Sequence, residues 1–163
     1  MHLADLLAAL ALAGLVFGAT LTVFAQGQLA YSRGAARVET QQTARLALAR
    51  MAREIRQSGS PGGALPPIAV AEPARIVIER DGHPITWQLS AGVLRRNAGA
   101  GAQPIVNGVR ALAFSYLDPS GRQTDVPGAV RAVVISLTTE PEHPRAGAAT
   151  LTKLTTEVRL RNR

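Results

Sequence analysis

The residues of this chain that could do chemistry are few, and their spacing argues against catalysis. The histidines are His2, His83 and His143. None has a second histidine at the spacing by which a helix presents metal ligands. Ser58 and Ser60 are not part of a G-x-S-x-G motif, and no phosphate-binding helix is predicted after Gly99. The chain has no Cys, so a thiol nucleophile is excluded. We therefore predict a non-enzymatic protein that needs no cofactor.

Two aspartates offer a weaker possibility, which is a bound cation. Asp118 and Asp125 flank a short polar stretch, but calcium prefers six or more oxygen ligands. The sequence from Asp118 to Gly121 is typical of a type I turn with Asp in first place, and we favour the turn over a metal site. Trp87 alternates with Ile85 and Leu89, so we expect it in the core.

Asp5 is the acidic residue with the most unusual surroundings. It precedes 27 consecutive uncharged residues that end before Arg33. An ionisable group at the end of a membrane helix costs a few kcal/mol if it lies in lipid without a partner. Asp5 is therefore expected either to pair with another group or simply to interact with the positive end of a helix, which contributes about 0.3 to 1 kcal/mol.

The element that must carry Asp5 is a long helix. All 10 Pro lie after residue 58, and about 20 apolar residues suffice to cross a bilayer. Residues 1–25 are predicted to form a transmembrane half. A signal peptide is the alternative, but a basic region ahead of the apolar run is lacking and the helical pattern continues.

The second half of the helix, residues 26–57, is predicted to be amphipathic. One face carries apolar side chains at helical spacing, which are Ala44, Leu48, Met51 and Ile55. Arginines occupy other faces, at positions 45, 50, 53 and 56. Residues 58–73 contain Gly, Ser and Pro and are interpreted as a linker.

Residues 74–163 alternate apolar and polar side chains, as antiparallel strands do. We expect strands near residues 75–80, 85–89, 93–96, 109–117, 130–139 and 151–160. Their apolar face and the helix stripe would each bury what the other exposes. The predicted fold class is α+β, with a long N-terminal helix packed on a C-terminal antiparallel sheet.

The start of the chain resembles the start of mature type IV pilin-like proteins. It reads Met1-His2-Leu3-Ala4-Asp5-Leu6-Leu7 and continues into the apolar run. Members of that family place an acidic residue fifth in the mature chain. The segment from Gln41 to Gln57, and the ending from Glu157 to Asn162, are similar to those of J-type minor pseudopilins of type II secretion systems and of related minor pilins.

The resemblance implies a role for each end of the membrane helix. Asp5 would pair with the free α-amine of a neighbouring subunit and set the register of a filament. Met1 would be the processed and methylated N-terminus. Family precursors carry a basic leader that ends in Gly, so three interpretations of Met1 stay open: a start further upstream, a mature form, or a chain that is not processed.

The resemblance also implies partners and a location. The partners would be other minor pseudopilins or pilins, the major subunit, an inner-membrane assembly platform and a prepilin peptidase. The helix would anchor the chain once in the inner membrane, with the head in the periplasm until assembly into a filament. Arg33, Arg37 and Arg45 follow the apolar run and by themselves favour the opposite orientation, which a basic leader would offset.

The net charge of +7 raises a second class of function, which is a bitopic protein whose head binds DNA or another ligand. Its best candidates are Arg159, Arg161 and Arg163. No aromatic side chains alternate with these arginines, and single-strand binding normally uses such stacking. DNA is therefore a less favoured partner, and a minor pilin of a type IV pilus or DNA-uptake system stays open as well.

Overall fold

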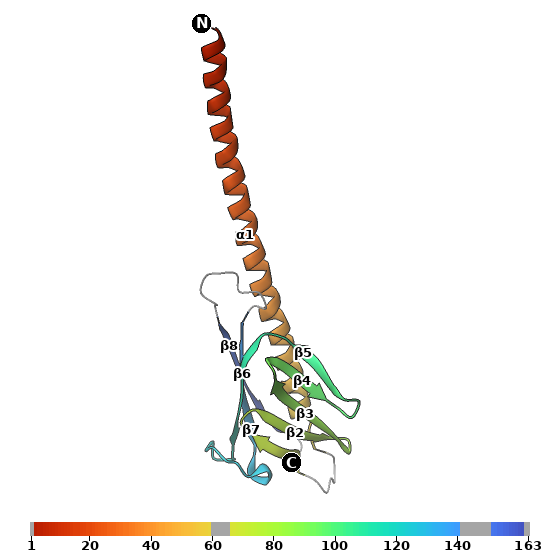
Figure 1. The fold of residues 1–163 in the computed structure, drawn as a ribbon. Coiled ribbons are helices and arrows are strands. Elements are labelled where there is room, and N and C mark those ends of the chain that lie inside the picture. The colour runs from red at the N-terminus through yellow and green to blue at the C-terminus, as the bar shows by residue number, and fades with distance from the viewer. Residues whose placement is uncertain (1, 60–65, 141–150, 162–163) are drawn as a thin grey trace. The chain divides into compact units, whose positions relative to one another are not determined.

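The structure, a computed structural model, describes residues 2–59, 66–140 and 151–161. Its described residues form one helix, α1 (His2–Arg56), eight strands and a short 3-10 helix, η1 (Pro127–Ala129), shown in Figure 1. The strands are β1 (Ile68–Glu72), β2 (Arg75–Arg80), β3 (His83–Ser90), β4 (Val93–Asn97), β5 (Ala102–Val106), β6 (Val109–Leu117), β7 (Ala132–Thr139) and β8 (Thr152–Arg159). The α+β fold class is confirmed.

The chain divides into two compact units, Met1–Val38 and Glu39–Arg163. The first consists of the N-terminal part of α1. The second, which we call the head, holds the C-terminal part of α1 and all the strands. Gly59, at φ +92, follows the last turn of α1 and donates its N–H to the carbonyl of Glu79, so the chain leaves the helix directly beside β2.

The first sheet of the head is an antiparallel meander in the order β1-β2-β3-β4-β5. Tight turns set its register. Asp81 and Gly82 both have positive φ, which is the geometry of a type I′ turn, and Arg80 pairs with His83 across it. Ala91 and Gly92 make an equivalent turn between β3 and β4.

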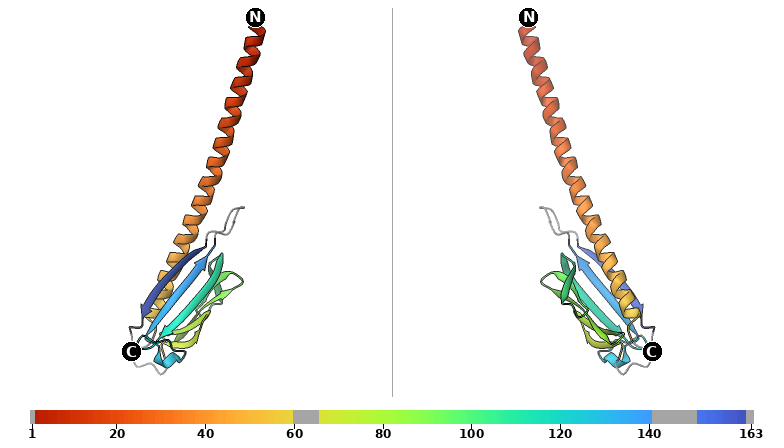
Figure 2. Two further views of the ribbon diagram at one scale, coloured as in Figure 1. Left: turned by 90° about the vertical axis from the view of Figure 1, so that its left-hand side faces the viewer. Right: turned by 90° about the vertical axis from the view of Figure 1, so that its right-hand side faces the viewer.

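The second sheet has the order β6-β7-β8 (Figure 2). Turns of the first sheet bond to β6, because Val109 N–H donates to the carbonyl of Gly92 at 2.9 Å and Phe114 N–H donates to that of Pro73 at 2.7 Å. The outer edge of β6 is therefore partly satisfied by backbone from the first sheet, and the two sheets are joined along it.

One hydrophobic core unites the C-terminal part of α1 with both sheets. The predicted stripe is confirmed, since its four apolar side chains are all buried, and so is the core position of Trp87. The second sheet contributes its inner face through Leu112, Phe114, Tyr116, Val133, Ile135, Leu137 and Val158. The apolar stripe of α1 thus covers part of the core that the two sheets do not cover for each other.

The sequence prediction missed two strands and a sheet boundary. The segment 58–73, interpreted as a linker, contains β1, so this interpretation is wrong for residues 68–72. Strand β5 was also missed, because Pro104 interrupts its pattern. A proline is tolerated there because β5 is the edge strand of its sheet. The strands form two sheets rather than the single sheet expected.

Candidate functional site

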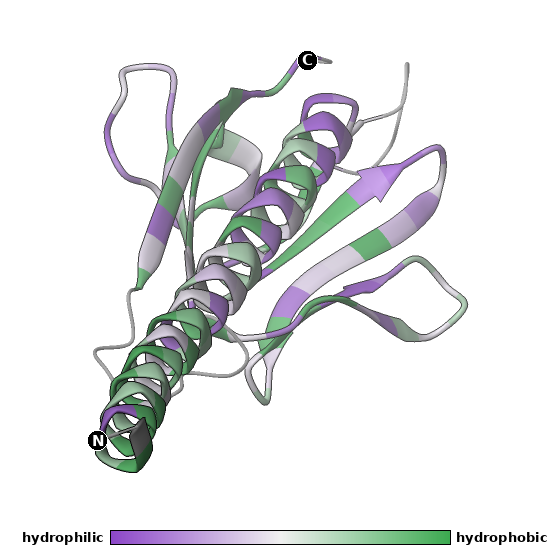
Figure 3. Ribbon diagram, turned by 90° about the horizontal axis from the view of Figure 1, so that it is seen from above, coloured by the Kyte–Doolittle hydropathy of each residue, from purple (hydrophilic) through white to green (hydrophobic). Residues whose placement is uncertain are grey.

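The first unit presents an apolar surface on every side of the helix. Large side chains from Leu3 to Phe24 are between 59% and 76% exposed, and none of the most apolar window is buried. Figure 3, coloured by hydropathy, shows this hydrophobic character in the first turns of α1. The helix is long and apolar enough to cross a membrane, and this fits a single-pass membrane protein.

Asp5 lies in the first turn of α1, where its charge complements the helix dipole. Its side chain is exposed, and within the described part of the chain no ion pair involves it. Met1, the candidate for processing, lies outside the described residues. The small residues Ala8 and Gly18 are also exposed along this segment, and a Cβ at Gly18 would meet no atom within 4 Å.

The head contains a buried carboxylate that sequence reasoning did not single out. Glu54, in the last turns of α1, is 5% exposed. Trp87 donates its indole N–H to Glu54 Oε2 at 2.9 Å, and Arg96 donates Nε–H to both carboxylate oxygens at 3.0 and 3.1 Å. Arg50, one turn earlier, lies 3.4 Å from Oε1. We call Glu54, Trp87 and Arg96 the buried glutamate cluster.

The cluster ties α1 to β3 and β4 through charge. Arg96 is 13% exposed, and its guanidinium carbon lies 6.0 Å from the centroid of the Trp87 ring, in cation–π range. Removing one partner of such a pair costs about 3–5 kcal/mol, because a buried charge is left uncompensated. The cluster therefore fixes which face of the helix meets the first sheet.

A sequence signal for the cluster was present. Glu54 follows Ala47 by seven positions and Met51 by three, which places it within the apolar stripe. A carboxylate at such a position must find a counter-charge, and the pair Arg95-Arg96 offered one. Alternation along β4 sends only Arg96 inward, toward Trp87, so Arg95 faces the opposite side of the sheet.

Beside the buried glutamate cluster lies a cavity of about 500 Å³. It opens between the last turns of α1 and the end of β2. Its lining residues are Leu46, Ala49, Arg50, Arg53, Glu54, Gln57 and Arg80. We call it the arginine cavity.

Asp118 and Asp125, the two aspartates considered as cation ligands, lie in the loop after β6. The Asp118 carboxylate forms hydrogen bonds within the turn of this loop. Asp118 Oδ1 accepts hydrogen bonds from the Ser120 hydroxyl and from the backbone N–H groups of Ser120 and Arg122. These bonds, the hydroxyl first, lower the pKa of Asp118. Asp125 is exposed, and no group of three potential metal ligands occurs among the residues that the structure describes.

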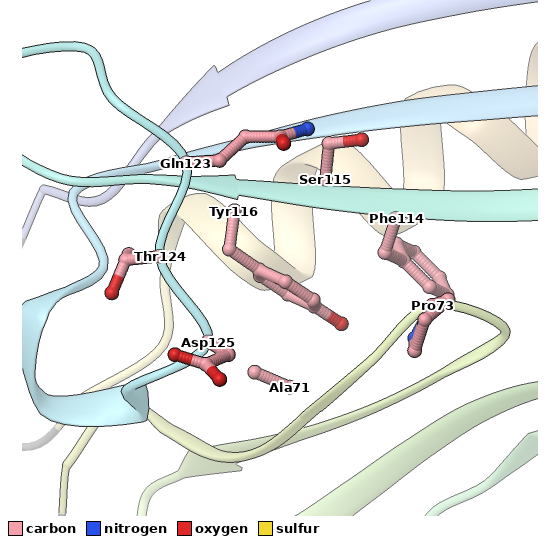
Figure 4. Close-up of a pocket in the computed structure, with 8 residues that line it drawn as sticks. All are labelled: Ala71, Pro73, Phe114, Ser115, Tyr116, Gln123, Thr124 and Asp125. Carbon is pink, nitrogen blue, oxygen red and sulfur yellow. The ribbon is translucent and has the colours of Figure 1, made fainter.

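A second cavity, of about 350 Å³, lies against β6 (Figure 4). The ring of Tyr116 projects from β6 toward the segment of Ala71 and Pro73, and Asp125 lies across from it. The Tyr116 hydroxyl donates to the carbonyl of Glu72 at 2.7 Å. Burial, and secondarily the charge of Glu72, raise the pKa of Tyr116. Tyr116 therefore has a structural role, because its hydrogen bond joins β6 of the second sheet to β1 of the first.

Of the three C-terminal arginines, the structure describes Arg159 and Arg161. Arg159 is 86% exposed at the end of β8, with Nε 3.5 Å from Glu157 Oε1, so its charge is partly offset. Arg161 is exposed beyond the strand, and Arg163 lies outside the described residues, as does His143. His83 sits beside the predicted hairpin turn, with Nδ1 2.9 Å from the carbonyl oxygen of Asp81.

Neither the protein-family models nor the curated proteins contain a match to this chain.

Proposed function

We propose that this chain is a non-enzymatic minor pseudopilin of a type II secretion system. Support comes from one combination of features. An exposed apolar helix headed by Asp5 continues into an amphipathic segment that packs against two antiparallel sheets. The resemblance of the first seven residues and of residues 41–57 to that family is the reason for choosing a pseudopilin over other single-pass proteins.

In this proposal the apolar segment works in two environments. Residues 1–25 first lie in the inner membrane, and they later pack against the same segments of other subunits in a filament core or in the priming tip of the filament, where a minor pseudopilin has its assembly role. Small residues such as Ala4, Ala8, Ala11 and Gly18 let neighbouring helices approach closely. Asp5 pairs with the α-amine of the next subunit, which offsets the cost of an unpaired charge among apolar groups. The head stays in the periplasm and contacts other minor subunits.

The experiment that tests this function replaces Asp5. In the native host, Asp5→Ala should abolish or strongly reduce incorporation into sheared or cross-linked filaments, whereas Asp5→Glu should preserve it. Asp5 lies outside the head, so both variants should keep a folded head, which circular dichroism checks. Normal incorporation of Asp5→Ala would contradict the register role.

Two further measurements separate the alternatives. Mass spectrometry of the native N-terminus should show cleavage after an upstream Gly and methylation of the new α-amine. Deletion of the gene should then block secretion of exported proteins. If it blocks piliation or DNA uptake instead, the chain is a minor pilin of that system.

Orientation can be measured directly because the chain has no Cys. Ser120→Cys, an exposed head position, should react with a membrane-impermeant maleimide added to intact spheroplasts. Protection until the membrane is lysed would place the head in the cytoplasm, as the arginines after the apolar run suggest on their own.

A further inference from the structure

The lining of the arginine cavity has an excess of positive charge. Three arginines and one carboxylate line it, a difference of two charges. That carboxylate, Glu54, already accepts hydrogen bonds from Trp87 and Arg96. Its bonds to these two residues are shorter than its 3.4 Å contact with Arg50.

The three guanidinium groups retain unused hydrogen-bond donors. Arg50 is 49% exposed, and Arg80 is 39% exposed with Nε 3.5 Å from the exposed carboxylate of Asp81. Among the described residues, none forms a hydrogen bond or ion pair with the side chain of Arg53. Each guanidinium has five N–H donors, so most of them face solvent at the cavity.

Two apolar residues of α1, Leu46 and Ala49, also line the cavity. Leu46 is 72% exposed and Ala49 is exposed beside it. Helical spacing places Leu46, Arg50 and Arg53 along one stripe of α1 that faces away from the core. An exposed leucine next to arginines suits a ligand with both aliphatic groups and negative charge, whereas a small inorganic anion would use only the charge.

We propose that the arginine cavity is a docking site for an acidic segment of a partner protein. Glutamate side chains of that segment accept hydrogen bonds from Arg53 and Arg80, and from the free donors of Arg50. Apolar side chains of the same segment cover Leu46. Charge complementarity of this kind sets partner choice and association rate. The site belongs to the head alone and goes beyond the proposed assembly function, because it does not require a filament.

The test uses the full chain in detergent and a short fluorescein-labelled peptide in which Glu alternates with Leu and Ala. Fluorescence anisotropy at moderate salt should show binding of this peptide and none of its Gln analogue. Arg53→Glu should weaken binding about tenfold, and Arg53→Glu with Arg80→Glu should weaken it further. Arg53→Lys should retain most of the affinity because it retains the charge.

The matched control is Arg45→Glu. Arg45 is exposed on the same helix and does not line the cavity, and the substitution changes net charge by the same amount. It should alter affinity less than about twofold, since Arg45 supplies no hydrogen-bond donor to the cavity and salt screens the charge of an exposed side chain. Thermal melting monitors folding, and Arg53→Gln replaces Arg53→Glu if the latter melts early.

Four outcomes would overturn the proposal. They are failure of the glutamate peptide to bind, equal binding of the Gln analogue, equal weakening by Arg45→Glu, and unchanged affinity on replacing Arg53. Arg53-dependent binding of inorganic phosphate without binding of the peptide would also reject an acidic segment and assign a simple anion site.

Discussion

Arg96 donates Nε–H to Glu54 at 3.0 Å across the boundary between β4 and α1, and both side chains are almost completely buried. The two residues lie 42 positions apart in the chain. A helix that carries a stripe of similar apolar side chains can rotate or slide with little loss of contact. A single buried charge pair removes that freedom, since only one register brings the two groups together.

Replacing Glu54 should therefore destabilise the head strongly. Glu54→Ala leaves Arg96 without a counter-ion and Trp87 without an acceptor, so the free energy of unfolding should fall by about 3–5 kcal/mol. Glu54→Gln keeps an acceptor and should cost less. Urea unfolding of the full chain in detergent, followed by Trp87 fluorescence, measures both. Equal, small losses would show that the cluster does not stabilise the packing of α1.

Tyr116 should make stability depend on alkaline pH. Its folded pKa is raised above the ordinary value of 10.0, so above about pH 10 the unfolded chain loses the hydroxyl proton before the folded head does. The contribution of Tyr116 to the free energy of unfolding should then be constant below pH 10 and should decrease as the pH rises above 10. Tyr116→Phe should remove that slope, and it should lower stability at neutral pH by about 1 kcal/mol through loss of the bond to Glu72.

Denaturation measured at several pH values for the wild type and Tyr116→Phe supplies the comparison. Identical slopes above pH 10 in the two proteins would refute the assignment to Tyr116.

The loop after β6 should loosen in acid. The lowered pKa of Asp118 means that its carboxylate contributes stability above the ordinary value of 3.8, and that this contribution is lost as pH falls through the lower folded value. Asp118→Ala should speed hydrogen exchange of the Ser120 and Arg122 amides at neutral pH. Ser120→Ala, which removes the hydroxyl donor alone, should have a smaller effect. Unchanged exchange in Asp118→Ala would mean that the turn holds without its side-chain bonds.

A charged substitution in the apolar segment should impair membrane insertion. Leu12→Arg places a charge in the middle of the exposed apolar surface and should cost about 2.5–3.5 kcal/mol for membrane insertion. Alkaline carbonate extraction should move a large part of the variant into the soluble fraction. Leu46→Arg, an exposed leucine in the head part of the same helix, provides the control and should leave membrane retention unchanged. If Leu12→Arg is retained like the wild type, the segment does not insert as proposed.

The sequence predicted those helices and strands whose apolar side chains recur at a regular spacing. The helical stripe from Ala44 to Ile55 and the alternation in residues 75–80 and 109–117 gave elements at the observed positions. Strand β1 was missed because it is short and follows two prolines, and β5 because Pro104 interrupts it. Both are edge strands, where propensity is weak and pairing with a neighbour decides the structure.

The candidate sites depended on long-range pairing, which a single sequence does not reveal. Arg95 and Arg96 look equivalent in the sequence, but the register of β3 on β4 places Arg96 opposite Trp87 and so toward the helix. Arg80 reaches the arginine cavity because the Asp81–Gly82 turn fixes where β2 ends. The role of Asp5 stays a prediction, since it concerns a neighbour outside this chain.

The last turns of α1 belong to the head, although amino-acid composition changes only after Ser58. A soluble fragment for crystallisation that begins at residue 59 would lack the part of α1 that packs against both sheets. Trp87 and Arg96 would then be exposed to water. Such a fragment should aggregate. A fragment that begins near Glu39, where the second compact unit starts, keeps the C-terminal part of α1 and omits the apolar N-terminal segment.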